Sequence, residues 1–207
     1  MFFKFVPLLV STLVCLVVAR RASHEKLVTF WLLWSGCIHL FMELSYGFFP
    51  EVVTQGSQIG FLEFMAQPAG MFSFLDPHWW SGLYTQYGRY DGRYVTHDSV
   101  ILMVTQAELV MAPGCFALAW MIAKRNRWRH GVQILLCTLQ AYGTYVYFFD
   151  PVYRGTWSTV MTHDIFDLFT FVIGLNGLWI AVPMIMIWQS SRAIAEMAAV
   201  TARETTS

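Results

Sequence analysis

The chain has 207 residues, of which 57% are hydrophobic, 17% aromatic and only 13% charged, with a mean hydropathy of +0.50. A water-soluble domain needs about twice that charged fraction, so the composition predicts a membrane-embedded protein. The 13 basic and 13 acidic residues cancel to a net charge of zero, which favours neither a nucleic-acid partner nor a basic protein partner.

A transmembrane helix needs roughly 20 mostly apolar residues to cross about 30 Å of hydrocarbon. By this measure the sequence predicts an all-α, polytopic membrane protein with five spans, at about 2–19, 27–49, 98–123, 131–149 and 165–189. The first span could instead be a cleaved signal peptide, since Lys4 stands near its start. No small-x-small cleavage motif precedes Arg20 and Arg21, so we expect this helix to be retained.

Basic residues collect in two of the connections between the spans. They are Arg20, Arg21 and Lys26 before the second span, and Lys124, Arg125, Arg127 and Arg129 before the fourth. The positive-inside rule places both connections in the cytoplasm. We therefore expect the N-terminus on the lumenal side and the C-terminus in the cytoplasm.

Residues 50–97 are too many for a simple loop and too aromatic for a solvated linker. Its aromatic residues include Phe61, Phe64, Phe72, Phe74, Trp79, Trp80, Tyr84 and Tyr87. Trp and Tyr prefer the membrane interface, which favours an interfacial belt over a lid on a ligand. In either case we expect this segment to lie at the interface or to cap the bundle.

The four cysteines all lie within apolar runs, so we expect small buried side chains rather than disulfides or a CxxC metal site. The sequence has no nucleophilic triad, no Gly-rich phosphate loop and no HExxH zinc motif. We expect no cofactor. We also expect no metal, because a His39–Glu43 pair lacks the further ligands that a metal site needs.

Ionisable side chains within the spans are expensive unless they face the bundle interior and find partners. His39 and Glu43 lie four residues apart, on one face of the second span, and Thr105 and Glu108 share a face of the third. At 1.5 Å per residue, His39 lies about 18 Å from the cytoplasmic end of its span. Glu108 and Asn176 lie about 15 and 18 Å from the opposite side. These residues therefore converge near the midplane.

Two carboxylates and an imidazole at one depth form an acid/base set, for which helix packing alone would have no need. Such a set can protonate an alkene or an epoxide and remove a proton elsewhere from the resulting cation. Trp179 could stabilise that cation with its π face. For Gln106 and Gln140, a contact that only locks one helix to another remains an equal alternative.

The sequence resembles the emopamil-binding protein family of sterol isomerases, which carry the EXPERA domain. The similarity covers about residues 37–190 and rests on CIHLFME (37–43), YGRYDGRYVTHD (87–98), QAYG (140–143) with Tyr147 and Phe148, and NGLW (176–179) with Pro183. It implies a five-helix protein of the endoplasmic reticulum with a membrane-facing cavity for a flat polycyclic substrate. His39 and Glu43 would donate the proton, and Asn176 and Trp179 would line the cavity.

The sequence departs from the family pattern in the third span. The family has a glutamate followed three residues later by a threonine, whereas here Thr105 stands at the expected glutamate position and Glu108 at the threonine position. The segment also reads Ala-Pro-Gly at 112–114 instead of Trp-Gly-Pro, and Thr144 replaces an aspartate. The carboxylate stays on the same face but moves about one helical turn, which leaves the final base and the substrate open.

We therefore expect a membrane isomerase that shifts a double bond of a sterol or related terpenoid, with His39, Glu43 and Glu108 as catalytic residues. Thr105, Tyr142, Asn176 and Trp179 are the expected substrate-binding residues. The alternatives are epoxide-opening cyclisation or hydrolysis of a secondary metabolite on the same fold, and non-catalytic lipid binding. Residues 1–26 would form a first helix and loop, 27–190 the EXPERA-like domain, and 191–207 a polar cytoplasmic tail. The expected partners are an apolar small molecule and the bilayer, without nucleic acid; a homodimer remains open.

Overall fold

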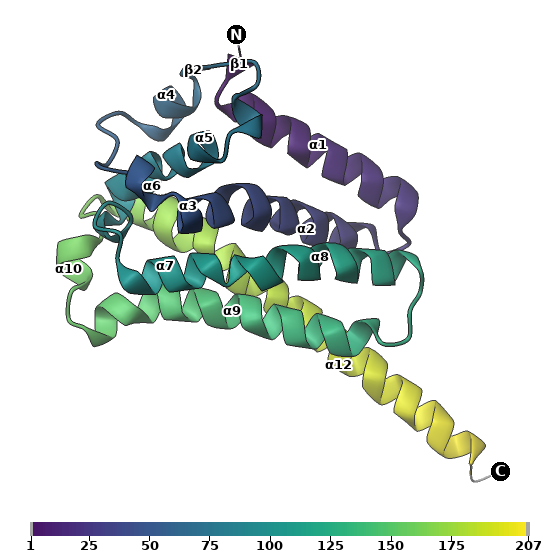
Figure 1. The fold of residues 1–207 in the computed structure, drawn as a ribbon. Helices are drawn as coiled ribbons and strands as arrows, with labels where there is room; N and C mark the ends of the chain where they lie inside the picture. Colours follow the sequence, from purple (N-terminus) through teal and green to yellow (C-terminus); the bar gives the residue numbers. More distant parts are fainter. Residues whose placement is uncertain (1, 206–207) are drawn as a thin grey trace.

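The computed structural model describes residues 2–205, and most of them belong to helices (Figure 1). Long helical stretches lie side by side as a bundle. They are α1 (Phe5–Ala22); α2 (Lys26–Cys37), continued by the π-helical segment η1 (Ile38–Glu43) and α3 (Leu44–Phe48); α7 (Ser99–Gln106) and α8 (Glu108–Ala123); α9 (Arg129–Tyr153); and α11 (Ile165–Asp167), the π-helical segment η5 (Leu168–Gly174) and α12 (Leu175–Glu204).

Four of these stretches, among the described residues, are long and apolar enough to cross a membrane: Phe5–Ala22, Lys26–Phe48, Ser99–Ala123 and Ile165–Glu204. They correspond to four of the five predicted spans, and the chain is an all-α membrane protein. The remaining predicted span is α9, which has 25 residues but a more polar composition. It packs extensively against α12 and also contacts α8, so α9 completes the bundle.

The centre of the bundle is filled by apolar side chains from α2, α8, α9 and α12. Its buried members are Trp31, Leu32, Met111, Cys115, Leu118, Ala119, Ile122, Leu136, Cys137 and Met186. Small residues let the backbones approach: a Cβ on Gly36 of α2 would lie 3.1 Å from the Cβ of Cys115 in α8. Cys15, Cys115 and Cys137 are buried and Cys37 is half-buried, as predicted for small apolar side chains.

Residues 50–97, here called the cap, cover one end of the bundle (Figure 1). The cap contains η2 (Pro50–Val52), α4 (Phe61–Met65), β2 (Pro68–Ala69), η3 (Ser73–Leu75), α5 (Pro77–Gly82), α6 (Tyr84–Tyr90) and η4 (Gly92–Tyr94). β2 pairs antiparallel with β1 (Phe2–Phe3), and Lys4 Nζ donates a hydrogen bond to Gln67 Oε1 at 2.8 Å. The cap is thus attached to the start of α1.

Arg93 forms a buried ion pair within the cap and also joins the cap to α9. The Arg93 side chain is only 2% exposed and that of Asp91 is fully buried. Arg93 donates to Asp91 Oδ2 at 2.7 Å and to the carbonyl oxygen of Tyr147 at 3.0 Å. At the same end, α10 (Trp157–Val160) is followed by a bridge between Met161 and Asp91.

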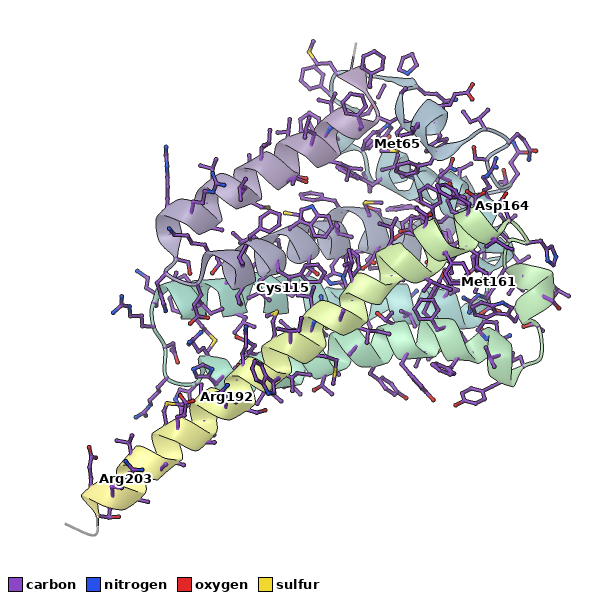
Figure 2. All side chains as sticks on the ribbon, turned by 180° about the vertical axis from the view of Figure 1, so that it is seen from behind. Met65, Cys115, Met161, Asp164, Arg192 and Arg203 are labelled. Atoms are coloured by element: carbon purple, nitrogen blue, oxygen red, sulfur yellow. The ribbon has the colours of Figure 1, made fainter. Side chains whose placement is uncertain are left out.

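The C-terminal part of α12 projects beyond the bundle (Figure 1). Figure 2 places Arg203 on this projecting part, whereas Met65, Met161 and Asp164 lie at the capped end. The polar tail expected at 191–207 therefore continues α12 as a regular helix through Glu204, within the described residues.

Candidate active site

The π-helical segment η1 carries His39 and Glu43. At the end of this segment, the backbone N–H of Leu44 donates to the carbonyl oxygen of His39, five residues earlier. In an α-helix the acceptor would lie four residues earlier. Such π-turns inside α-helices are frequent at functional sites. The Nδ1 atom of His39 is hydrogen-bonded directly to Glu43 Oε2. The predicted contact is therefore present, although the backbone between the two residues is π-helical rather than α-helical.

Glu108, the first residue of α8, approaches the same imidazole from the neighbouring helix. Its Oε2 lies 2.8 Å from His39 Nδ1. That oxygen has no hydrogen-bond donor among the described residues, because the Nδ1–H points at Glu43. His39 is 2% exposed and Glu108 7%. The structure thus brings all three predicted acid/base residues together, with both carboxyl groups beside the same ring nitrogen.

The other ring nitrogen of His39 faces two neutral side chains. Ser35 Oγ lies 2.9 Å from His39 Nε2, and Gln140 Nε2 lies 2.8 Å from it. Ser35 Oγ also accepts hydrogen bonds from Gln140 Nε2 at 2.7 Å and from Trp179 Nε1 at 3.2 Å. Because Ser35 accepts from both, its own hydroxyl hydrogen is free to donate to His39 Nε2. The neutral imidazole therefore carries its proton on Nδ1, toward the carboxyl groups.

Ser35 and Gln140 were not among the predicted site residues. For Gln140 the sequence leaves a contact that only joins helices as an equal alternative; the side chain does join α9 to α2, and it also contacts His39. Ser35 lies one helical turn before His39, on the same face, and this spacing was the available signal. Gln106, by contrast, donates to the carbonyl oxygen of Gly47 at 3.4 Å and links α7 to α3.

The acid/base cluster forms part of the wall of a cavity of about 850 Å³. The cavity is lined mostly by apolar and aromatic side chains from α1, α2, η1, α6, α7, α8, α9, η5 and α12. Its lining includes Met103, Val110 and Tyr142, which are 71%, 64% and 63% exposed. The cavity therefore reaches the outer surface of the bundle beside α7, α8 and α9, where a membrane protein faces lipid.

The four predicted substrate-binding residues all line this cavity, but they differ in what they offer a ligand. Trp179 packs edge-on to His39, with 6.5 Å between ring centroids. The Thr105 hydroxyl donates to the carbonyl oxygens of Ile101 and Leu102, within its own helix. Its polar group is thus already paired.

Tyr142 and Asn176 complete the predicted set. Tyr142 lies at the outer surface and stacks on Tyr145, with 6.2 Å between ring centroids. The Asn176 amide donates to the carbonyl oxygen of Val172 at 2.8 Å, within the η5 to α12 stretch. Asn176 thus lies at the cavity, as its height predicts, but its amide contacts its own helix.

The expectation of no metal rested on His39 and Glu43 alone, and the structure adds Glu108 to them. One potential ligand atom from each residue lies within 4.8 Å of the other two. This is the donor set, among the described residues, that could hold a cation. His39 Nδ1 nevertheless contacts both carboxylates directly, at 2.8 Å from Glu108 Oε2, which is hydrogen-bond spacing. The arrangement as it stands is that of groups that share protons.

The cap supplies one wall of the cavity. Tyr84, Tyr87, Tyr90 and Tyr94 line it, as does Phe61. Other aromatic residues of the cap stay outside: Phe72 is 68% exposed and Phe74 42%. Phe64 and Trp80 are buried in a separate apolar cluster, so the belt favoured from the sequence accounts only for the exposed members of the segment.

The family of the chain follows from its similarity to known proteins. The model of the EXPERA (EXPanded EBP superfamily) family matches residues 79–190, more than half of the chain. The chain belongs to the EXPERA family. The match ends at Ser190, as expected, and includes Glu108, Tyr142, Asn176 and Trp179. It begins at Trp79, whereas the predicted similarity began at Cys37, so His39 and Glu43 lie outside it.

Three relatives of this EXPERA protein have named activities. A protoglabretal synthase of Citrus sinensis is 25% identical over 167 residues, or 80% of this chain and 69% of that protein. A probable 3-beta-hydroxysteroid-Delta(8),Delta(7)-isomerase of Arabidopsis thaliana is 25% identical over 195 residues, 93% of this chain and 78% of the relative. An isomeliandiol synthase of Melia azedarach is 22% identical over 194 residues, 92% of this chain and 81% of the relative.

Proposed function

We propose that this EXPERA protein is an integral-membrane isomerase that moves a ring double bond of a sterol or a related terpenoid. The observation that carries the proposal is His39, held between the carboxyl groups of Glu43 and Glu108 in the wall of a largely apolar cavity. A buried imidazole with two carboxyl groups can both give and take a proton where water is excluded. The relatives named as isomerase and synthases support the enzyme class.

The reaction needs one proton delivered and one removed. The Glu43–His39 pair gives a proton to one alkene carbon, and the other alkene carbon becomes cationic. Glu108 then removes a proton from the carbon on the far side of the cation, and the electrons of that C–H bond form the new double bond. Electrons and protons balance, so the step consumes no redox cofactor. The faces of Trp179 and the cap tyrosines would stabilise the cation.

A second candidate reaction keeps the same residues but protonates an epoxide, which opens to drive ring closure or hydrolysis. The position of Glu108 favours it, since this carboxyl group lies one helical turn from where the family pattern expects it. Two of the relatives are also named as synthases. Product analysis with a Δ8-sterol separates the candidates, because only the isomerase moves the double bond.

Substitution of the carboxyl groups tests the catalytic proposal. We expect Glu43→Gln and Glu108→Gln each to lower turnover by about 100-fold or more, because general acid/base groups contribute about 10²- to 10⁴-fold. Glu63→Gln, at an exposed position of α4, is the matched control and should keep wild-type turnover. Wild-type turnover by both site variants would contradict the catalytic roles of Glu43 and Glu108, whereas a wild-type protein that binds the sterol and converts none of it would support a protein that only binds lipid.

The proposed setting is the endoplasmic reticulum membrane, with the N-terminus and the cap on the lumenal side and residues 191–207 in the cytoplasm. Residues 27–190 would form the catalytic domain, and residues 1–26 an additional helix and loop. The basic residues between α1 and α2, and those between α8 and α9, support this orientation. A glycosylation acceptor introduced in the exposed stretch around Gln55 should be glycosylated, and one introduced in the loop at Asn126 should not.

A further inference from the structure

The part of the cavity formed by α6 contains a second polar group, separate from the acid/base cluster. The Gln86 side chain is 3% exposed and lines the cavity. Its Nε2 donates to the Tyr90 hydroxyl oxygen at 2.6 Å. Its Oε1 is buried and has no hydrogen-bond partner among the described residues. Buried amide oxygens are rarely left unpaired, so this atom is suited to accept a hydrogen bond from a ligand.

The surroundings of Gln86 are aromatic. The Tyr90 ring stacks on Phe171 of η5, with 4.7 Å between centroids and 5° between the planes. Phe171 in turn contacts Phe61 of the cap, at 5.0 Å between centroids. All three rings line the same cavity as His39, Glu43 and Glu108. One hydrogen-bond acceptor surrounded by aromatic rings suits a flat, apolar ligand that carries one hydrogen-bond donor.

A hydroxyl group is the donor that this position fits best. Burial raises the pKa of the Tyr90 phenol, so that side chain is a neutral hydroxyl that accepts from Gln86. A ligand hydroxyl can donate to Gln86 Oε1 without bringing a charge into an apolar cavity, whereas an ammonium group would have no carboxylate of α6 to pair with. A ketone has no hydrogen to donate to this oxygen.

We propose that Gln86 Oε1 accepts a hydrogen bond from a hydroxyl group of the substrate and so sets which ring carbon lies at the acid/base cluster. Gln86 is then a positioning residue that selects hydroxylated polycycles over those without the hydroxyl group. This inference rests on the proposed function, because it takes the ligand of the cavity to be a sterol or a related molecule.

Equilibrium binding of two sterols tests the inference. The full-length protein in detergent would be titrated with a 3-hydroxy Δ8-sterol and with its 3-deoxy analogue. An unmade buried hydrogen bond corresponds to about 5- to 150-fold in affinity, so wild type should prefer the hydroxylated sterol by at least about fivefold. Gln86→Leu should bring the two affinities to within about twofold, mainly by weakening binding of the hydroxylated sterol. Gln55→Leu, at an exposed position of the cap, should keep the wild-type preference.

Two further variants distinguish the loss of this hydrogen bond from misfolding. Gln86→Met keeps the length of the side chain without its polar atoms and should also lose the preference. Tyr90→Phe removes only the partner of the amide nitrogen and should retain part of it. Thermal unfolding of each variant establishes that it is folded, and any variant that unfolds early is replaced by the other substitution at Gln86.

The inference is overturned if wild type binds both sterols equally, if both Gln86 variants keep the preference, or if wild type binds the 3-keto analogue more tightly than the alcohol. The readout is binding, so it is separate from turnover. A Gln86-dependent preference without isomerisation would contradict the proposed function alone. Isomerisation without such a preference would contradict this inference alone.

Discussion

His39 presents its two ring nitrogens to different kinds of partner. Nδ1 faces the carboxyl groups of Glu43 and Glu108, and Nε2 faces the neutral Ser35 and Gln140. The neutral side fixes the ring and leaves the exchangeable proton on the carboxyl side. This arrangement separates orientation of the imidazole from proton transfer, and each function can be perturbed by itself.

Ser35→Ala tests the orienting side of the imidazole. The substitution removes the hydroxyl that contacts His39 and also accepts from Trp179, and one such hydrogen bond contributes about 1 kcal/mol. We expect kcat to fall about fivefold to tenfold while the protein remains folded. Ser45→Ala, at another buried serine of the same transmembrane stretch, is the control and should keep the wild-type kcat. An unchanged kcat in Ser35→Ala would contradict the orienting role.

The sequence predicts His39, Glu43 and Glu108 because ionisable groups are rare and costly inside a membrane. Ser35 could not be predicted in the same way, since serine is a common packing residue between membrane helices. The four-residue spacing places Ser35 beside His39, but its contacts with Gln140 of α9 and Trp179 of α12 depend on the convergence of α2, α9 and α12 at one point. That convergence is a property of packing, which residue spacing within one helix does not report.

At the scale of elements, the site depends on the close approach of α2 and α8. Gly36 of α2 faces Cys115 of α8, and any Cβ there would lie 3.1 Å from Cys115 Cβ and from the Phe116 ring. His39 lies one turn beyond Gly36 on the same stretch, and Glu108 begins α8. Separation of the two helices at Gly36 would therefore also move His39 away from Glu108.

Gly36→Ala is expected to lower both stability and turnover. Overpacking a tight contact costs about 1–3 kcal/mol, and for a chain of this size each kcal/mol lowers Tm by about 2–4 °C. Gly131→Ala in α9 is the matched control, because its Cβ would meet no atom within 4 Å. The control should be neutral or slightly stabilising, since alanine favours the helix by about 0.5–1 kcal/mol. Equal Tm values for the two variants would contradict the close-approach argument.

The helices themselves follow from apolar stretches of sufficient length, and four of the predicted spans are present as such. The π-helical segments η1 and η5 do not follow from the sequence, because an α-helical period fits residues 38–43 and 168–174 equally well. The wider turn at η1 depends on tertiary contacts, among them those of His39 with Gln140 of α9 and Glu108 of α8.

At the scale of the whole molecule, the cap closes one end of the bundle and contributes tyrosines to the cavity. The cap is held to α9 by Arg93, which contacts Asp91 of the cap and the carbonyl oxygen of Tyr147. Aromatic content predicts that such a segment lies at the interface. It does not predict which rings turn inward, since that depends on how the cap sits on the bundle.

Arg93→Met tests this attachment. The substitution leaves Asp91 buried without its partner, which costs about 3–5 kcal/mol. We expect Tm in detergent to fall by about 6–20 °C. Arg192→Ala removes an exposed pair with Glu196 at 3.5 Å and should change Tm by about 1 °C or less. Similar Tm values for both variants would show that the cap is held by other contacts.

Isomerisation in heavy water tests the central claim most directly. Purified protein would be incubated in D₂O with a Δ8-sterol, and the product analysed by mass spectrometry and NMR. The proposal predicts a Δ7 product that carries one deuterium at C9, where the cluster adds a solvent-derived proton, and a Glu108→Gln variant that forms this product about 100-fold more slowly. Recovery of the Δ8-sterol unchanged and without deuterium, from a folded wild-type protein that binds it, would contradict the proposal.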